Sequence, residues 1–353
     1  MKAHFQKYTL NFKQASGTSR GVYTTRDSWF IFLSNGTNTG IGECAPLPDL
    51  SIESPKRMSA KLLQVCEQIG YFSQSPEELN AWPSIRFGLE TALLDLKNGG
   101  KQELFPSAFT RGEQGIPING LIWMGTPELM KQQIRAKLDA GFRCIKMKIG
   151  ALDFETEFEL LKAIRSEFSA EEITLRVDAN CAYSYQTALE NLKRLSDLQI
   201  HSIEQPIATG RWNEMAELCH KSPVPIGLDE ELIGISSGKE MQKLLETIHP
   251  AYLILKPSLH GGFAGCEKWI EQAEKIGSGW WITSALESNI GLNAIAQWAF
   301  HLNAKNEQGL GTGQLFTNNF DSPLEIEGDQ LWFRPEKSWN LQNLQISNPD
   351  DDF

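Results

Sequence analysis

Five charged residues recur along the middle of this chain at a nearly constant interval of 25 to 30 residues. They are Lys148 in KMKIG, Asp178 in RVDAN, Glu204 in IEQP, Asp229 in GLDEE and Lys256 in ILKPS. Each ends a short apolar or β-branched run and is followed by a helical pattern, as in a repeated strand-loop-helix unit. Parallel strands in such a repeat end on one rim of a barrel, and that rim carries the chemistry. The interval therefore predicts an α/β barrel with five charged groups on one rim.

The candidate strands of this barrel have centres near residues 120, 146, 176, 202, 227, 254, 282 and 311. Eight strands is the number that closes a parallel barrel. The segments between them have helical patterns; Thr126, for example, is expected to cap a helix with Met130, Ile134 and Leu138 on one face. No helical stripe follows the last strand, GLGTG. We therefore expect a modified TIM barrel, (β/α)7β, without its last helix.

The first part of the chain does not have the βα period. SWFIFLSNGTNTGIGE predicts a hairpin with strands near 28–34 and 39–43 around the turn-forming pair Asn35-Gly36. A helical stretch covers roughly 54–70. These patterns indicate an α+β module ahead of the barrel.

Two further helix signals complete this module. The run Ser75-Pro76-Glu77-Glu78 predicts a capping box, and Pro83 is expected to restart the helix as SIRFGLETALLDLKNGG. We expect the segment after the barrel to return to this module, and the acidic end NPDDDF to be frayed. The expected domains are an α+β capping domain over 1–112, the barrel over 113–315 and the returning segment over 316–353.

Composition limits the partners. A chain of 353 residues with 22% charged residues is ordinary globular material, and its net charge of −11 disfavours non-specific binding to nucleic acid. A small anionic substrate is still compatible with this net charge, because a few local cations can outweigh the overall negative field. The N-terminal segment MKAHFQKYTL has no apolar signal region, and no apolar stretch is long enough to span a membrane. The six cysteines form no CxxC pair. We expect a cytoplasmic protein with a small carboxylate substrate, no nucleic-acid or membrane partner, and a sequence compatible with an oligomer.

Asp178, Glu204 and Asp229 would end three consecutive strands, so their carboxylates are expected to converge. Three hard oxygen ligands without histidine or cysteine suit Mg²⁺, and Mn²⁺ is also possible. A single such residue is more often a solvated loop acid or a helix cap. Three at matched positions favour the metal site.

Lys146 and Lys148 are two residues apart on one strand, so their side chains point the same way. Two ammonium groups beside a metal ion repel each other, which favours the neutral amine that a general base requires. Lys256, four strands on, would face Lys148 across the barrel mouth as a second catalytic lysine. One alternative is that all three are surface lysines, although each lies within an apolar run. Another is that one of them is a Schiff-base nucleophile.

Lys146, Arg176, Asn180 and Ser284 are candidate substrate-binding residues. Arg176 and Asn180 share the face of Asp178, but a strand salt bridge and a turn-forming asparagine explain them equally well. Ser284 closes the seventh strand and could also be a helix cap. Glu230 is expected to point elsewhere. No role is assigned to His201, His249 and His260.

A divalent metal between two lysines suits removal of a proton next to a carboxylate, because the metal and the lysines can stabilise the resulting enediolate. Return of a proton on the other face gives epimerisation, whereas loss of a β-hydroxyl gives dehydration.

The five motifs resemble those of the enolase superfamily in its lysine-base, muconate-lactonizing-like subgroup, over almost the whole chain. That resemblance implies a capping domain over a modified barrel. GIGECAPLPDLS, FGLETALLDL, ALESNIG and GTGQLF are similar to segments of the o-succinylbenzoate synthase family. This implies metal-dependent dehydration of 2-succinyl-6-hydroxy-2,4-cyclohexadiene-1-carboxylate in menaquinone biosynthesis. Lys148 would take the α proton and return it to the departing hydroxyl, and Lys256 would stabilise the enediolate.

The resemblance also implies that loops around Thr25, Arg26 and Pro46-Leu47-Pro48 close over the substrate. The main alternative is an N-acylamino acid racemase or dipeptide epimerase of the same superfamily. GLGTGQLF lacks the Asp-x-Asp that dipeptide epimerases of this family carry, which disfavours dipeptides. A Schiff-base aldolase and a non-catalytic metal-binding or interaction protein are the other classes. The aldolase would need no metal. The complete set of five charged groups disfavours the non-catalytic protein, because decayed sites usually lose a charged group that is costly to keep buried.

Overall fold

The computed structural model describes residues 1–18 and 21–346. Its N-terminal part is an antiparallel sheet in the order β1 (Lys2–Thr18), β2 (Gly21–Ser34) and β3 (Thr39–Cys44). The predicted hairpin is confirmed as β2 and β3. The Asn35 side chain accepts hydrogen bonds from the backbone N–H groups of Thr37 and Asn38 at 3.0 and 2.9 Å, and Gly36 has φ +90°. The long strand β1 was not anticipated from the sequence.

Helices cover one face of this sheet. They are η1 (Pro55–Arg57), α1 (Met58–Glu67), α2 (Ile69–Phe72), η2 (Pro76–Leu79) and α3 (Pro83–Lys97). The restart at Pro83 is confirmed, and α3 buries Ile85, Leu89 and Ala92 against the sheet. It approaches β3 so closely that a Cβ on Gly42 would overlap the carbonyl oxygen of Gly88.

The prediction of a capping box at residues 75–78 is wrong. The Ser75 side chain makes no capping hydrogen bond, and Pro76–Leu79 forms only a short 3₁₀ turn. Residues 80–82 connect this turn to α3, which starts at Pro83, a residue whose fixed φ suits the first position of a helix.

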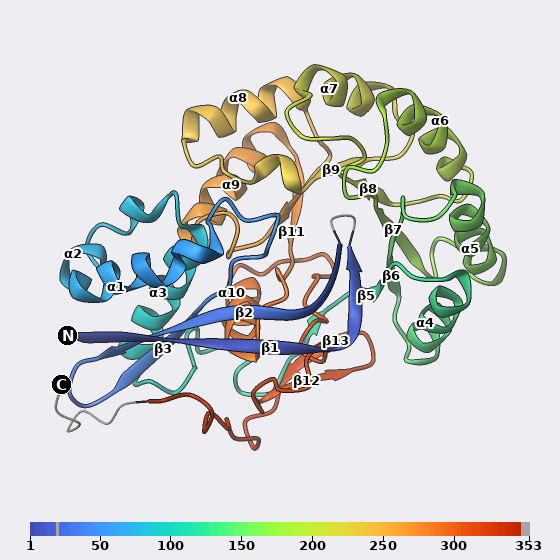
Figure 1. Ribbon diagram of the computed structural model, residues 1–353. Helices are drawn as coiled ribbons and strands as arrows, with labels where there is room; N and C mark the ends of the chain where they lie inside the picture. The colour runs from blue at the N-terminus through green and yellow to red at the C-terminus, as the bar shows by residue number, and fades with distance from the viewer. Residues whose placement is uncertain (19–20, 347–353) are drawn as a thin grey trace.

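The barrel is a curled parallel sheet surrounded by helices (Figure 1). Its strands are β5 (Gly120–Ile122), β6 (Cys144–Lys148), β7 (Thr174–Asp178), β8 (Ser202–Glu204), β9 (Ile226–Leu228), β10 (Tyr252–Leu255) and β11 (Gly279–Ile282). The helices are α4 (Pro127–Asp139), α5 (Phe154–Glu167), α6 (Tyr185–Ser196), α7 (Trp212–Lys221), α8 (Gly238–Ile248), α9 (Gly262–Ile276) and α10 (Asn289–His301), with η3 (Glu230–Leu232) after β9. The predicted N-cap Thr126 accepts a hydrogen bond from Leu129 N.

The eighth strand is not where the sequence placed it. Residues around 311 form a turn, and the eighth position is reduced to two parallel bridges, Ile118↔Gln308 and Thr283↔Gly309. Gln308 N donates to Pro117 O at 2.8 Å, and Gly309 N donates to Ile282 O at 2.8 Å. The Gln308 side chain also accepts from Ile282 N at 2.7 Å, so it replaces part of a strand ladder. These bonds close the barrel between β11 and the start of β5.

No helix follows this closing segment among the described residues up to 346, in agreement with the expected (β/α)7β barrel. The chain instead forms β12 (Leu324–Glu327) and β13 (Gln330–Phe333), which join β4 (Ile116–Pro117) in an antiparallel sheet. None of the described helices has the length and apolar character needed to cross a membrane.

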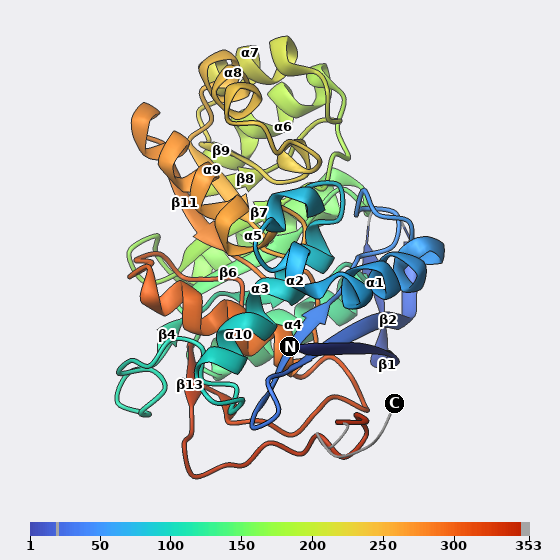
Figure 2. The same ribbon diagram turned by 90° about the vertical axis from the view of Figure 1, so that its left-hand side faces the viewer.

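Part of the C-terminal segment lies along the N-terminal sheet, as Figures 1 and 2 show. Lys13 N donates to Leu315 O and Thr317 N donates to Asn11 O, both at 2.8 Å. Phe320 packs edge-on against Phe30 of β2. The domain limits expected from the sequence stay a prediction, and the frayed end predicted at NPDDDF lies outside the described residues.

A buried carboxylate holds the N-terminal sheet on the barrel. Glu43 of β3 accepts hydrogen bonds from Ser28 Oγ at 2.8 Å, Ser288 N at 3.0 Å and Gly291 N at 2.9 Å. The last two donors belong to the N-terminus of α10, where the helix dipole favours a negative charge. This contact fixes the capping part over the rim where β11 ends.

Candidate active site

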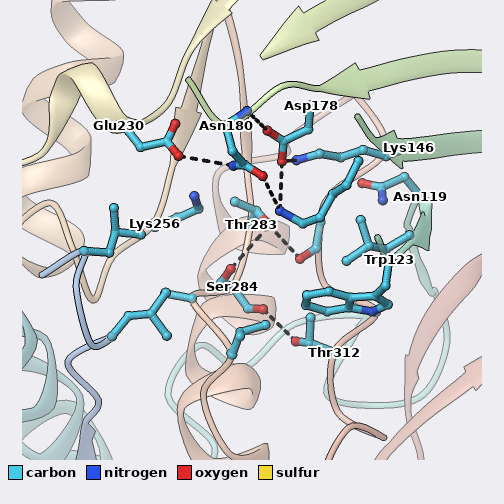
Figure 3. A pocket seen from close by; sticks show the side chains of 18 of the residues that line it. Asn119, Trp123, Lys146, Asp178, Asn180, Glu230, Lys256, Thr283, Ser284 and Thr312 are labelled. Carbon is cyan, nitrogen blue, oxygen red and sulfur yellow. Dashed lines mark hydrogen bonds and ion pairs between the residues drawn. The ribbon is translucent and has the colours of Figure 1, made fainter. Parts of the chain in front are cut away.

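A cavity lies at the carboxyl ends of the barrel strands. Figure 3 shows the side chains that converge on it. The N-terminal part contributes Tyr23, Leu47 and Leu50, and the barrel supplies the other lining residues. The cavity therefore lies between the two parts of the molecule.

Lys146 and Lys148 both point into this cavity from β6, as alternation along a strand requires. Lys148 Nζ donates to Asp178 Oδ2 at 3.2 Å and to Asn180 Oδ1 at 2.8 Å. Lys146 Nζ forms ion pairs with Asp178 Oδ2 at 3.3 Å and with Glu204 Oε2. Asp178 thus accepts from both lysines.

The three predicted metal ligands are buried at the ends of β7 and β8 and directly after β9. Asp178 lies beside Glu204 in the sheet register, and Lys146 interacts electrostatically with both carboxylates and with Asp229. Burial raises the pKa of Glu204 to about 7, and the nearby charges of Asp178 and Asp229 add to this although Lys146 opposes it. Burial also acts to raise the pKa of Asp178, but Lys146 and Lys148 outweigh it and hold that pKa below its usual value.

Lys256 stands on another wall of the cavity (Figure 3). Its Nζ donates to Asp229 Oδ1 at 2.6 Å and also contacts Oδ2. Burial acts to lower the pKa of Lys256, but Asp229 and Glu230 outweigh it and raise that pKa. The backbone N–H of Lys256 donates to Nδ1 of His260 at 3.0 Å, so this histidine, to which no role was assigned, supports the chain at Lys256.

Among the described residues, no group of three acidic, histidine or cysteine side chains forms a ready-made metal site. The ammonium groups of Lys146 and Lys256 lie against the carboxylates instead. The donor chemistry nevertheless fits a hard divalent cation, because Asp178, Glu204 and Asp229 offer only carboxylate oxygens. Glu204 is 0% exposed, and its Oε1 atom is buried without a hydrogen-bond partner.

Gln205 and Glu230 shape the site in ways that the sequence did not reveal. Gln205 Oε1 accepts hydrogen bonds from Asp229 N and Glu231 N, both at 3.3 Å, and so connects the end of β8 to the end of β9. Glu230 was expected to point away, but it lines the cavity and accepts from Asn180 Nδ2 at 3.1 Å. The reason is that strand alternation stops at Asp229, where the chain turns into η3.

Two of the candidate substrate-binding residues lie where they were expected. Asn180, in a left-handed conformation with φ +42°, lines the cavity between Lys148 and Glu230. Ser284 also lines it, with its Oγ 2.6 Å from Oγ1 of Thr312. The geometry leaves both hydroxyl groups within reach of a bound molecule.

Arg176 does not line the cavity and is no longer a substrate-binding candidate. It is 1% exposed and donates to Glu307 O at 2.8 Å and to Glu307 Oε2 at 3.0 Å, with its guanidinium over the Trp281 ring. Because it precedes Asp178 by two residues, it points inward one layer below the rim. The alternative interpretation of Arg176, a salt bridge made from a strand, accounts for its contacts with Glu307.

The loops expected over the substrate are only partly at the cavity. Leu47 lines it, but Arg26 is buried outside it and donates to the carbonyl oxygens of Ala45 and Ala285. Arg26 therefore joins a capping loop to the loop after β11. Several lining residues were missed because they are uncharged: Asn119, Leu121, Trp123, Thr283 and Thr312.

Two family models match this chain: the MenC N-terminal domain over residues 1–96 and the enolase C-terminal domain-like family over residues 129–336. The o-succinylbenzoate synthase of Desulfotalea psychrophila is 46% identical, over 94% of this chain and 98% of the relative. The crystal structure of MenC from the same organism superposes with a TM-score of 0.84 and 42% identity, covering 94% of this chain and 99% of that one.

A more distant relative is an L-Ala-D/L-amino acid epimerase of a Maribacter species, 25% identical over 84% of this chain and 86% of the relative. At 46% identity over nearly the full length of both proteins, the Desulfotalea relative decides the assignment. The chain therefore belongs to the o-succinylbenzoate synthase family of the enolase superfamily.

Proposed function

We propose that this protein catalyses the dehydration of 2-succinyl-6-hydroxy-2,4-cyclohexadiene-1-carboxylate to o-succinylbenzoate, a step of menaquinone biosynthesis. Membership of the family supports this reaction. The observation that carries it is the placement of Lys148 and Lys256 in one cavity, together with Asp178 and its neighbouring carboxylates. Such a site can remove a proton next to a carboxylate and stabilise the enediolate that forms.

Lys148 is proposed as the general base. In its neutral form, its Nζ would take the proton from C1 of the ring, and the C–H electron pair would form an enediolate with the attached carboxylate. The electrons then form the C1–C6 double bond as the C6–O bond breaks. Lys148 returns its proton to the departing hydroxide, which leaves as water. Asn180, 2.8 Å from Lys148 Nζ, would hold the amine in position during both transfers.

Lys256 is proposed to stabilise the enediolate as a cation. Without a metal in the site, Asp229 and Glu230 raise the pKa of Lys256 against the effect of burial. A fixed ammonium group needs no reorganisation when negative charge develops on the substrate. Lys146, charged for the same kind of reason, is proposed to help hold the substrate carboxylate.

We propose that Asp178, Glu204 and Asp229 hold one divalent cation, Mg²⁺. Mn²⁺ is the alternative ion that suits the same oxygen donors. When bound, the metal would act as a Lewis acid towards the substrate carboxylate. The buried and unpartnered Oε1 of Glu204 supports this assignment.

The remaining proposals concern partners and location. A carboxylate substrate fits the lysines in the cavity in spite of the net charge of −11. The six cysteines are free, which supports a reducing compartment such as the cytoplasm.

The test is to assay the purified protein on the cyclohexadiene substrate and on N-succinylamino acids, with and without Mg²⁺. We expect rapid, metal-dependent loss of the diene absorbance, reduced by about 10²- to 10⁴-fold in Lys148→Met. Diene turnover that needs no metal, or that is undiminished in Lys148→Met, would contradict the mechanism. Racemisation of N-succinylamino acids without diene turnover would favour the racemase alternative.

A further inference from the structure

One side of β5 and of the residues that flank it lines the cavity without contributing any ionisable group. Asn119, Leu121 and Trp123 alternate along this part of the chain, and all three are lining residues. Figure 3 shows Asn119 and Trp123 on the side of the cavity where Lys146 enters it. The catalytic proposal uses none of the three, so their chemistry is available for binding.

Trp123 presents a fixed aromatic surface beside the proposed base. The Lys148 Nζ atom lies 5.8 Å from the centroid of its ring. The Trp123 backbone is held at both ends by Gln133, whose Oε1 accepts from Trp123 N at 2.8 Å and whose Nε2 donates to Trp123 O at 3.2 Å. The indole also packs against a buried cluster that includes Leu286 and Phe316. Its orientation is therefore set before a substrate binds.

Asn119 supplies an unused polar group next to this surface. The residue is 4% exposed, and its Oδ1 atom is buried without a hydrogen-bond partner. Its backbone N–H donates to Gln308 O at 3.0 Å, which fixes the chain where the barrel closes. A buried amide without a partner is rare in proteins, and one that lines a cavity is suited to a ligand group.

We propose that the cavity-facing side of β5, with the two residues that flank it, selects a ring-shaped substrate: Trp123 packs on the face of the six-membered ring, and Asn119 Oδ1 accepts a hydrogen bond from the C6 hydroxyl group of the substrate. This inference rests on the proposed function for the identity of the ring. A rigid indole matches a flat conjugated ring better than an acyclic chain, because stacked π-systems attract each other beyond the area that they bury. N-acylamino acids with small side chains offer no such surface.

The experiment measures kcat and KM for the cyclohexadiene substrate in Trp123→Leu, Trp123→Phe and Asn119→Leu, with Trp332→Leu as the control. Trp332 lies on β13 and is not among the lining residues. Calorimetry on the same variants, in the presence of Mg²⁺, measures the affinity for o-succinylbenzoate and for N-succinylalanine, which has no ring.

Trp123→Leu should raise KM and weaken o-succinylbenzoate binding by roughly fivefold, a typical effect of losing an aromatic pair. N-succinylalanine binding should change by less than about twofold, and Trp123→Phe should restore most of the loss. Asn119→Leu should raise KM for the cyclohexadiene substrate by roughly tenfold or more, because the hydrogen bond from the C6 hydroxyl is lost, whereas o-succinylbenzoate, which has no such hydroxyl, should bind with an affinity changed by less than about twofold. The Trp332 control should match the wild type.

Equal losses for both probes in Trp123→Leu, unchanged o-succinylbenzoate affinity in Trp123→Leu, or an unchanged KM for the diene in Asn119→Leu would overturn the inference. If Asn119→Leu fails to fold, Asn119→Ala gives the same measurement with a smaller side chain. A wild-type protein that does not turn over the diene contradicts the proposed function alone. The contrast between the two probes still decides whether β5 recognises a ring.

Discussion

Glu53 offers a test of how burial controls the stability of this fold. It lies in the loop that carries the cavity residues Leu47 and Leu50, and it is 4% exposed. Its Oε1 accepts from Ser84 N, in the first turn of α3, at 2.6 Å, while its Oε2 is buried without a partner. Burial raises the pKa of Glu53 to about 7, although the hydrogen bonds to α3 oppose the shift.

The direction of the pH effect follows from this shift. An unfolded chain releases the Glu53 proton near pH 4.3, whereas the folded protein retains it until about pH 7. Between these values the folded state binds more protons, so the free energy of unfolding falls as pH rises. At about 1.4 kcal/mol per pKa unit, the total loss by pH 8 is about 4 kcal/mol.

Glu53→Gln should remove this loss. A glutamine and a protonated glutamic acid are both uncharged, so neither carries the cost of burying a charge. The amide NH₂ has one more donor than the acid O–H, and this difference is the same at every pH. Relative to the wild type, the variant should therefore gain about 4 kcal/mol of stability between pH 4.5 and pH 8, a shift of about 5 °C in Tm for a chain of 353 residues. Urea unfolding at both pH values measures the difference.

The exposed Glu77→Gln is the matched control and should change stability by less than about 0.5 kcal/mol at either pH. A gain in Glu53→Gln that is the same at pH 4.5 and pH 8 would show that the carboxylate is not the cause. A loss of stability at pH 8 would refute the reasoning, because it would mean that ionised Glu53 is favourable in the folded protein.

Three further outcomes concern the cavity. Lys146→Met should destabilise the metal-free protein by roughly 3 kcal/mol, because it leaves Asp178 and Glu204 buried without a shared cation. Urea unfolding at pH 8 measures this loss, and a change below about 1 kcal/mol would contradict the ion pairs. Mg²⁺ at 100 times its Kd should raise the free energy of unfolding of the wild type by about 2.7 kcal/mol. This gain should be largely lost in Asp229→Asn, and an equal gain in both proteins would exclude Asp229 as a ligand. Lys256→Met should lower kcat on the diene by roughly 10²-fold or more while the melting profile stays that of a folded protein, and unchanged kcat would exclude an electrostatic role for Lys256.

Much of the barrel could be predicted because its signals are local. Apolar runs that end in a charge and precede a helical stripe identify strands without any knowledge of tertiary contacts. The predicted strand centres near 146, 176 and 254 fall within β6, β7 and β10. Register then places Lys148, Asp178 and Glu204 side by side, since parallel strands of one sheet end at the same edge.

The errors arose where long-range pairing decided the local structure. The eighth strand lies at Gln308 and Gly309 because their hydrogen-bond partners are Pro117 and Ile282, which are distant in sequence. Arg176 has the spacing of a rim residue, but its ion pair with Glu307 lies one layer below the rim. Neither partnership leaves a periodic signal in the sequence.

The sequence by itself determined the barrel, the capping part before it and the five charged residues on the rim, because these depend on spacing and on alternation along strands. Only the tertiary structure decided which uncharged residues complete the cavity. Trp123 and Asn119 become binding candidates through their contacts with Gln133 and Gln308, and Glu230 through the turn after β9. Charge at a strand end is visible in one dimension, whereas the burial of an unpaired amide or the face of a ring exists only after the chain has folded.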